Sequence, residues 1–120
     1  MSATRLLLVD DVPQVRQELR TLLSLVGEIE IVGEAADGVA ALQQCAALQP
    51  EAILIDLEMP QMDGYEATRR IKTNYPGCRV VVLTVHGYDS ARQMALQAGA
   101  DAFVVKGAPL ESLLQAIKNP

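Results

Sequence analysis

The 120-residue sequence has no excess of positive charge. Ten Lys and Arg residues stand against fifteen Asp and Glu residues, which gives a formal net charge of −5. A chain of this charge is repelled by polyanions, so bare DNA and anionic membrane surfaces are poor partners for it taken alone. We therefore expect no direct nucleic-acid binding by this chain.

Cysteine, histidine and long apolar runs are also scarce. The two cysteines, Cys45 and Cys78, form no CxxC pair, and the chain has a single histidine. This favours two small buried thiols in a reduced, cytoplasmic protein over a redox or zinc site. The apolar run near the N-terminus, residues 6–9, is too short for a signal peptide or a membrane span. The sequence thus predicts a soluble, cytoplasmic protein without membrane contact.

Two alternating patterns organise the chain. Short apolar runs, typical of strands buried on both faces, occur at residues 6–9, 29–32, 52–55, 80–83 and 102–105. Between them, apolar residues recur every three or four positions, as in amphipathic helices. Five strand–helix pairs predict one α/β domain over residues 1–120, a flavodoxin-like (βα)5 doubly wound parallel sheet with strand order 2-1-3-4-5. A (βα)8 barrel needs about twice this length.

Three acidic residues stand at predicted strand ends. Asp10 and Asp11 follow the first apolar run, and Asp56 follows the third. In the predicted strand order these two ends are neighbours, so the carboxylates converge. Close carboxylates raise one another's pKa unless a cation neutralises them, and oxygen ligands suit Mg²⁺, with Mn²⁺ as a second choice. The alternative is that one of the adjacent pair only caps the next helix and Asp56 is a turn residue. We expect one acid to cap while the cluster holds a metal ion.

A hydroxyl and an ammonium are predicted at the same edge. Thr84 ends the fourth strand and Lys106 follows the fifth. A site for a metal alone has little use for a lysine, whereas a phosphoryl group on one aspartate would contact metal, lysine and hydroxyl together. Taken singly, a solvated lysine and a strand-favouring threonine remain alternatives.

Four segments in this order resemble the receiver domain of two-component response regulators. They are "LLLVDD", "ILIDLEMPQMDGYEATRRIK", "VVVLTVH" and "AGADAFVVKGAPLESLLQAI", and together they cover nearly the whole chain. The resemblance implies a switch that takes a phosphoryl group from a histidine kinase. It is closest to the subfamily with a helix-turn-helix transcriptional output.

The resemblance also assigns roles to the acidic residues. It implies that Asp56 is the phosphoacceptor. It implies that Asp11, Asp56 and the backbone carbonyl of Glu58 bind Mg²⁺ directly, with Asp10 acting through a water molecule.

The remaining roles concern the phosphoryl group and the switch. The resemblance implies that Lys106 pairs with a phosphoryl oxygen, that Thr84 moves to hydrogen-bond it, and that Phe103 swings inward. Phe103 replaces the commoner tyrosine, so plain core packing of this ring is an equal alternative. Gly107 stands where many receivers have proline.

Two further residues are expected to tune the site. Glu58 adds a carboxylate at the rim, where it either impedes phosphate or positions water, unless it is only a solvated loop acid. His86 is expected to modulate water access rather than to bind Mg²⁺, which prefers oxygen, and a plain surface histidine is the alternative.

The expected function is a signalling switch and not an enzyme, apart from its own phosphorylation and dephosphorylation. Phosphorylation would change the surface of the fourth helix, fifth strand and fifth helix, and so control an output domain after Pro120, a partner protein or a homodimer. The alternatives are a stand-alone signalling module and a small phosphatase or phosphotransferase with an aspartate nucleophile. A mononucleotide binder is disfavoured because "DDVPQ" is no phosphate loop.

Overall fold

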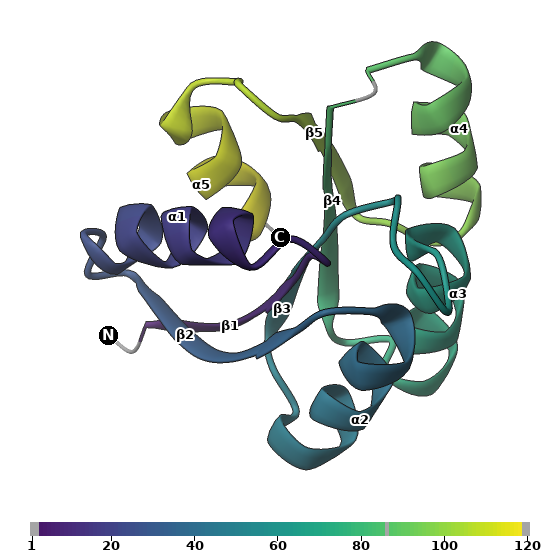
Figure 1. Cartoon of the computed structure of the whole chain (residues 1–120), viewed down its shortest axis with the longest axis horizontal. Helices are drawn as coiled ribbons and strands as arrows, with labels where there is room; N and C mark the ends of the chain where they lie inside the picture. The colour runs from purple at the N-terminus through teal and green to yellow at the C-terminus, as the bar shows by residue number, and fades with distance from the viewer. Residues whose placement is uncertain (1–2, 86, 119–120) are drawn as a thin grey trace.

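The computed structural model describes residues 3–85 and 87–118, in which five strands alternate with five helices (Figure 1). The strands are β1 (Thr4–Val9), β2 (Ile29–Ala35), β3 (Ala52–Ile55), β4 (Arg79–Thr84) and β5 (Ala102–Val105). The helices are α1 (Pro13–Ser24), α2 (Gly38–Leu48), α3 (Gly64–Asn74), α4 (Asp89–Gln97) and α5 (Leu110–Lys118). All strand pairs are parallel, in the order β2-β1-β3-β4-β5. The predicted flavodoxin-like sheet is confirmed.

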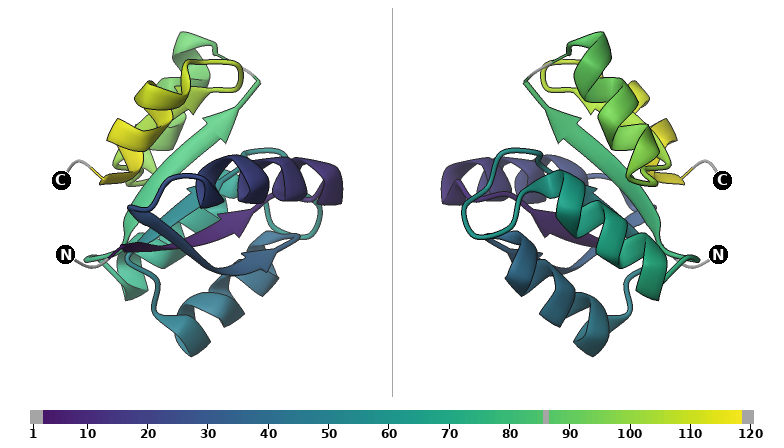
Figure 2. Two further views of the ribbon diagram at one scale, coloured as in Figure 1. Left: turned by 90° about the vertical axis from the view of Figure 1, so that its left-hand side faces the viewer. Right: turned by 90° about the vertical axis from the view of Figure 1, so that its right-hand side faces the viewer.

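The sheet lies between two helical layers. Helices α1 and α5 cover one face, and α2, α3 and α4 cover the other (Figures 1 and 2). Successive residues of a strand point to opposite faces, so Leu6 and Leu8 pack in the cluster with α1 and α5. Leu7 and Val9 pack in the cluster with the other three helices. Burial on both sides is why these strands read as continuous apolar runs.

Aspartate side chains cap the N-termini of α2 and α3, but not that of α1. Asp37 accepts a hydrogen bond from the N–H of Ala40 at 2.7 Å at the start of α2, and Asp63 acts likewise at α3. The expectation that Asp10 or Asp11 caps α1 is wrong. The N-cap residue is Val12, which makes no side-chain cap, and the helix starts with a proline that lacks an N–H to satisfy.

Both cysteines are buried and unpaired, as predicted. Cys45 and Cys78 lie in the cluster beneath α2, α3 and α4. Burial raises the pKa of Cys45 to about 11 and that of Cys78 to about 12. At neutral pH both are therefore protonated thiols that act as small apolar side chains.

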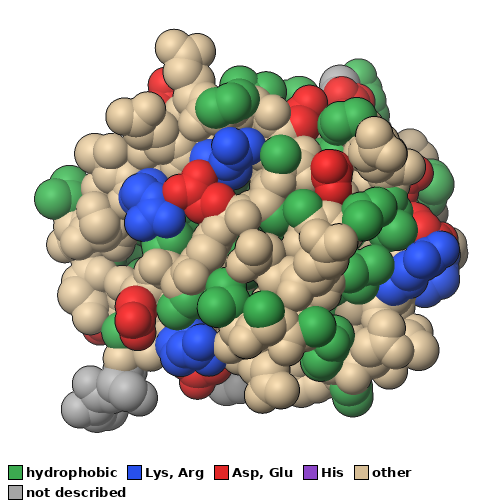
Figure 3. Space-filling view, turned by 60° about the horizontal axis from the view of Figure 1, so that its bottom comes forward, with side chains coloured by type: hydrophobic (Ala, Val, Ile, Leu, Met, Phe, Trp, Pro, Cys, Tyr) green, Lys and Arg blue, Asp and Glu red, His purple; other side chains and the backbone are tan. Residues whose placement is uncertain are grey.

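Charged side chains on the surface are mixed in sign. On the face that Figure 3 draws, Lys and Arg side chains stand in separate groups, each next to Asp or Glu. Within the described residues, no helix is long and apolar enough to cross a bilayer.

Lys72 bridges three segments of the chain at the end of the sheet opposite the acidic residues. Its ammonium donates to the carbonyl oxygens of Pro76 at 3.1 Å and Cys78 at 2.9 Å, and to Asp101 Oδ2 at 2.9 Å. The same Asp101 oxygen accepts from the N–H of Val80 at 2.8 Å. One lysine thus joins the end of α3, the start of β4 and the turn before β5.

Replacing Lys72 by methionine should lower the free energy of unfolding by about 2 kcal/mol, because three acceptors lose one charged donor. Urea denaturation followed by circular dichroism measures this. The matched control is Lys118→Met, which breaks only an ion pair with the exposed Glu28 and should cost under about 0.5 kcal/mol. Equal losses in the two variants would contradict this role.

Candidate functional site

The ends of neighbouring strands bring the predicted site residues to one edge of the sheet. Asp56 directly follows β3, and its N–H donates to the carbonyl oxygen of Val9 at the end of β1, at 3.0 Å. On the other side, Thr84 pairs in register with Val105, and the N–H of Lys106 donates to the Thr84 carbonyl oxygen at 2.7 Å. The predicted convergence at the carboxyl edge of the strands is therefore present.

Three carboxylates gather there. One oxygen from each of Asp10, Asp11 and Asp56 lies within 4.8 Å of the others. Asp10 is buried with only 3% of its surface exposed, the Asp56 side chain is largely buried, and Asp11 is exposed. An all-oxygen set that is open on one side suits a hard divalent cation that retains some of its waters. The donor chemistry therefore fits the magnesium ion that the sequence predicts.

The side chain of Lys106, the residue after β5, lies beside two of these carboxylates. Its ammonium lies 3.2 Å from Asp10 Oδ2 and 3.8 Å from Asp56 Oδ2. Three ionised carboxylates and one ammonium leave these four side chains with a net charge of −2 (1 − 3). The remaining negative charge is what a divalent ion would neutralise.

Asp56 is held in a setting that disfavours its charged form. Burial raises its pKa above the ordinary value. The charge of Lys106 lowers the pKa, that of Asp10 raises it, and the N–H groups of Leu57 and Glu58 lower it. The Leu57 N–H donates to Asp56 Oδ1 at 2.8 Å, so one carboxylate oxygen has a fixed direction. A cation beside Asp56 would favour the carboxylate, which is the form that can act as a nucleophile.

The other predicted site residues lie around this cluster. Thr84 is fully buried at the end of β4, and Glu58 is exposed at the rim. The Phe103 ring lies in the core, with the guanidinium of Arg92 from α4 over it at 5.0 Å from the ring centroid. A buried ring is compatible both with plain core packing and with the inward position of the switch. His86 lies outside the described residues.

Gly64 is a site residue whose role sequence reasoning missed. A Cβ at this position would lie 2.2 Å from the carbonyl oxygen of Asp56 and 2.7 Å from Cα of Leu57. The Gly64 N–H also donates to the Leu57 carbonyl oxygen at 2.9 Å. The first residue of α3 therefore lies directly against the backbone of Asp56, an approach open only to glycine. Its place after Asp63, a helix-start signal, was the only hint in the sequence.

The loop from β3 to α3 contains one strained residue. Gln61 has φ of 71°, the left-handed region that costs a non-glycine residue about 1 kcal/mol or more. Gln61→Gly should therefore raise the free energy of unfolding by about 0.5–1 kcal/mol, as measured by urea denaturation. Gln43→Gly, inside helix α2, is the opposite control and should lower it by about 1 kcal/mol. A loss at both positions would mean that position 61 is not strained.

The chain matches known proteins over nearly its whole length. Residues 6–118 match the family model of the response regulator receiver domain. The response regulator GacA of Pseudomonas viridiflava is 37% identical over 114 residues, which are 95% of this chain and 53% of that protein. The chain thus spans about half the length of the curated relatives it matches.

Solved structures agree with this assignment. The signal receiver domain of a NarL regulator from Mycobacterium tuberculosis superposes with a TM-score of 0.91 at 31% identity, over 100% of both chains. A chain in the CheX–CheY–BeF3–Mg complex of Borrelia burgdorferi has a TM-score of 0.88 at 26% identity, over 96% of this chain and 87% of that one. Two of the matched structures are described as LuxR-family regulators. The chain belongs to the response regulator receiver domain family.

Proposed function

We propose that this domain is a signalling switch in which Asp56 accepts a phosphoryl group from a phosphohistidine of a histidine kinase, in a Mg²⁺-dependent reaction. One observation carries the proposal: three carboxylate oxygens lie within 4.8 Å of one another, beside a single lysine, at the carboxyl edge of the sheet. A cluster of this charge fits a metal ion, and the lysine adds a contact for an anion.

The transfer needs few protein groups. An Asp56 carboxylate oxygen forms the new bond to phosphorus while the bond from phosphorus to the donor's imidazole nitrogen breaks, and the electron pair leaves with that nitrogen. Asp10, Asp11, Asp56 and the Glu58 carbonyl would hold Mg²⁺, which supplies charge neutralisation when bound.

Two residues would hold the product. Lys106, already 3.8 Å from Asp56 Oδ2, is placed to pair with a phosphoryl oxygen, and the Thr84 side chain would hydrogen-bond another. The added charge would bias the arrangements of Thr84 and Phe103, with Glu58 and His86 tuning the exposure of the phosphoryl group to water.

The output is proposed to be transcriptional. The chain spans about half of its curated relatives, and matched structures include LuxR-family regulators, one described as DNA-binding. These comparisons support an output domain after Pro120. The receiver would control it in the cytoplasm, through the surface of α4, β5 and α5 or through a homodimer. The receiver domain itself would act on no substrate other than its own phosphoryl group.

The test compares the melting temperature of the chain with Mg²⁺ alone, with beryllofluoride alone and with both. A ligand at 100 times its Kd stabilises the folded state by about 2.7 kcal/mol. Mg²⁺ alone should therefore raise the melting temperature, beryllofluoride alone should not, and the two together should raise it several degrees above the value with Mg²⁺ alone. Unchanged melting with both ligands would contradict the proposal. Multiple turnover of p-nitrophenyl phosphate would instead support the phosphatase alternative.

A further inference from the structure

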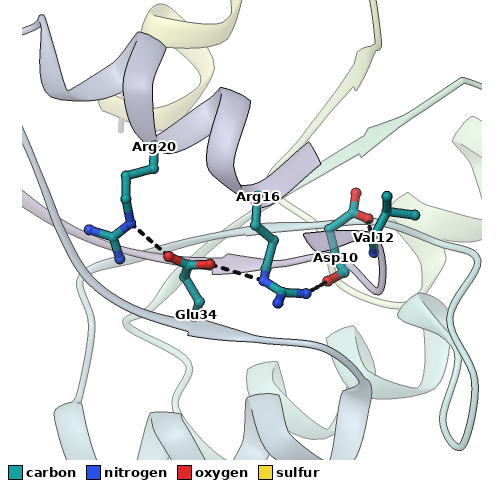
Figure 4. Close-up of polar contacts among 5 residues, drawn as sticks. All are labelled: Asp10, Val12, Arg16, Arg20 and Glu34. Atoms are coloured by element: carbon teal, nitrogen blue, oxygen red, sulfur yellow. Dashed lines mark hydrogen bonds and ion pairs between the residues drawn. The ribbon is translucent and has the colours of Figure 1, made fainter. Parts of the chain in front are cut away.

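A line of charged side chains runs from the surface to the backbone of the acid cluster (Figure 4). Arg16 and Arg20 project from successive turns of α1, and Glu34 lies opposite them on β2. Glu34 accepts from Arg16 Nε through Oε1 at 3.0 Å and from Arg20 Nε through Oε2 at 2.6 Å. Arg16 then donates from a terminal guanidinium nitrogen to the backbone carbonyl oxygen of Asp10 at 2.6 Å. Arg16, Arg20 and Glu34 take no part in the proposed phosphoryl transfer.

The carbonyl that Arg16 binds lies at a special point of the fold. Val9 and Ala35 are the last register pair between β1 and β2, so the Asp10 carbonyl lies just past the end of that ladder. Arg16 supplies this oxygen with a donor from α1. The carbonyl of Asp10 and the N–H of Asp11 belong to one rigid peptide plane. Fixing that oxygen therefore fixes the direction in which the chain enters Asp11.

The Asp10 side chain is fixed from two other sides. Its Oδ1 accepts from the N–H of Val12 at 2.9 Å, and its Oδ2 faces Lys106 at 3.2 Å. Arg16 adds a third contact, to the main chain between Asp10 and Asp11, whose side chains belong to the acid cluster.

Glu34 keeps the arginine in this place. The Arg16 side chain is largely buried, with 17% of its surface exposed, and one terminal guanidinium nitrogen reaches the backbone of Asp10, one of the three clustered acids. Burial alone would raise the pKa of Glu34, but hydrogen bonds and charge from Arg20 and Arg16 hold it below the ordinary value, so Glu34 stays ionised. A charged Glu34 holds the Nε side of the guanidinium against β2 and leaves a terminal nitrogen to donate to the Asp10 carbonyl.

We infer that Arg16, anchored by Glu34, is a positioning residue that sets the Asp10–Asp11 peptide for binding of a divalent cation. The inference rests on the proposed function, because it assigns this role to a cluster proposed to bind Mg²⁺. Partners of this kind, which orient ligand residues without touching the metal, change affinity by about 10- to 100-fold when removed.

The test is calorimetric titration of Mg²⁺ into the 120-residue chain, with no phosphodonor present. Arg16→Met should raise the Kd for Mg²⁺ about tenfold relative to the native chain. The direction of the change in Kd distinguishes an electrostatic effect from a positioning effect. Loss of a positive charge near three carboxylates should by long-range electrostatics tighten cation binding, whereas loss of positioning weakens it. Arg16→Lys should also weaken binding, because one ammonium does not reproduce a planar fork that reaches the carbonyl and Glu34 together.

The matched control is Arg70→Gln, which breaks a surface ion pair with Glu66 on α3 and should leave the Kd unchanged. Thermal melting of every variant confirms that folded protein is titrated, and if Arg16→Met does not fold, Arg16→Lys gives the result. An unchanged or lower Kd in the folded Arg16 variants, with normal binding by the native chain, would overturn the inference and leave the proposed function intact. No Mg²⁺ binding by the native chain would overturn both.

Discussion

Asp56→Asn should take up no phosphoryl group from acetyl phosphate, even at saturating Mg²⁺. An amide oxygen is too weak a nucleophile to form the acyl phosphate, and the variant also removes one of the three carboxylates that surround the proposed metal position. Mobility in a phosphate-affinity gel measures the modified fraction. Asp89→Asn, at the exposed start of α4, is the matched control and should be modified like the native chain. Modification of both variants alike would remove Asp56 from its proposed role.

Although Asp56→Asn should abolish phosphorylation, it should raise the stability of the metal-free chain. Burial, reinforced by the charge of Asp10, raises the pKa of Asp56 in the folded chain. The folded state then binds the proton more tightly than the unfolded state, so stability of the metal-free protein falls as the pH rises through that raised pKa. Without Mg²⁺, Asp56→Asn should lack this fall and should unfold at higher urea concentration than the native chain near neutral pH. A less stable Asp56→Asn chain would contradict the assigned cause.

Gly64→Ala should unfold far more easily than the native chain and should also lose phosphorylation. The new methyl group would meet two backbone atoms, which cannot rotate aside as a side chain can. Because the start of α3 or the backbone of Asp56 has to move, we expect a loss of about 3 kcal/mol or more in the free energy of unfolding. Urea denaturation gives this value. The phosphate-affinity gel measures how much of the chain that remains folded becomes phosphorylated.

Gly27→Ala is the control for this substitution. A Cβ at Gly27 would meet no atom within 4 Å, and its φ lies outside the region that favours glycine. This variant should stay within about 0.5 kcal/mol of the native chain. If Gly64→Ala were as stable as Gly27→Ala, the contact between α3 and Asp56 would be looser than the structure shows.

The sequence was sufficient to predict the strands of the sheet, because each strand is marked by a short continuous apolar run. The run at residues 102–105 coincides with β5, and the strand order follows from general rules for open α/β sheets. The same rules placed Asp56 and Lys106 at one edge, although 50 residues separate them (106 − 56). Helix faces were less certain. Leu22 fits the apolar spacing of α1 but is 41% exposed, while Leu23 is fully buried.

The features that could not be predicted depend on distances between elements. The pair Arg16 and Glu34 is 18 residues apart and follows no helical or strand spacing, so only the packing of α1 beside β2 reveals it. The close approach of Gly64 to Asp56 is likewise visible only from the packing of α3 against the end of β3. The expected cap on α1 failed because the helix begins at Pro13, which puts Val12 at the N-cap position in place of an aspartate, and Asp10 accepts from the N–H of Val12 instead.

The most direct test of the account is to locate the phosphoryl group chemically. The chain is incubated with acetyl phosphate, in Mg²⁺ or in EDTA, then reduced with borohydride, which converts an acyl phosphate to an alcohol that tandem mass spectrometry assigns to one residue. We expect conversion at Asp56 alone, and only in the sample with Mg²⁺. Conversion at Asp10 or Asp11, or equal conversion in EDTA, would contradict it.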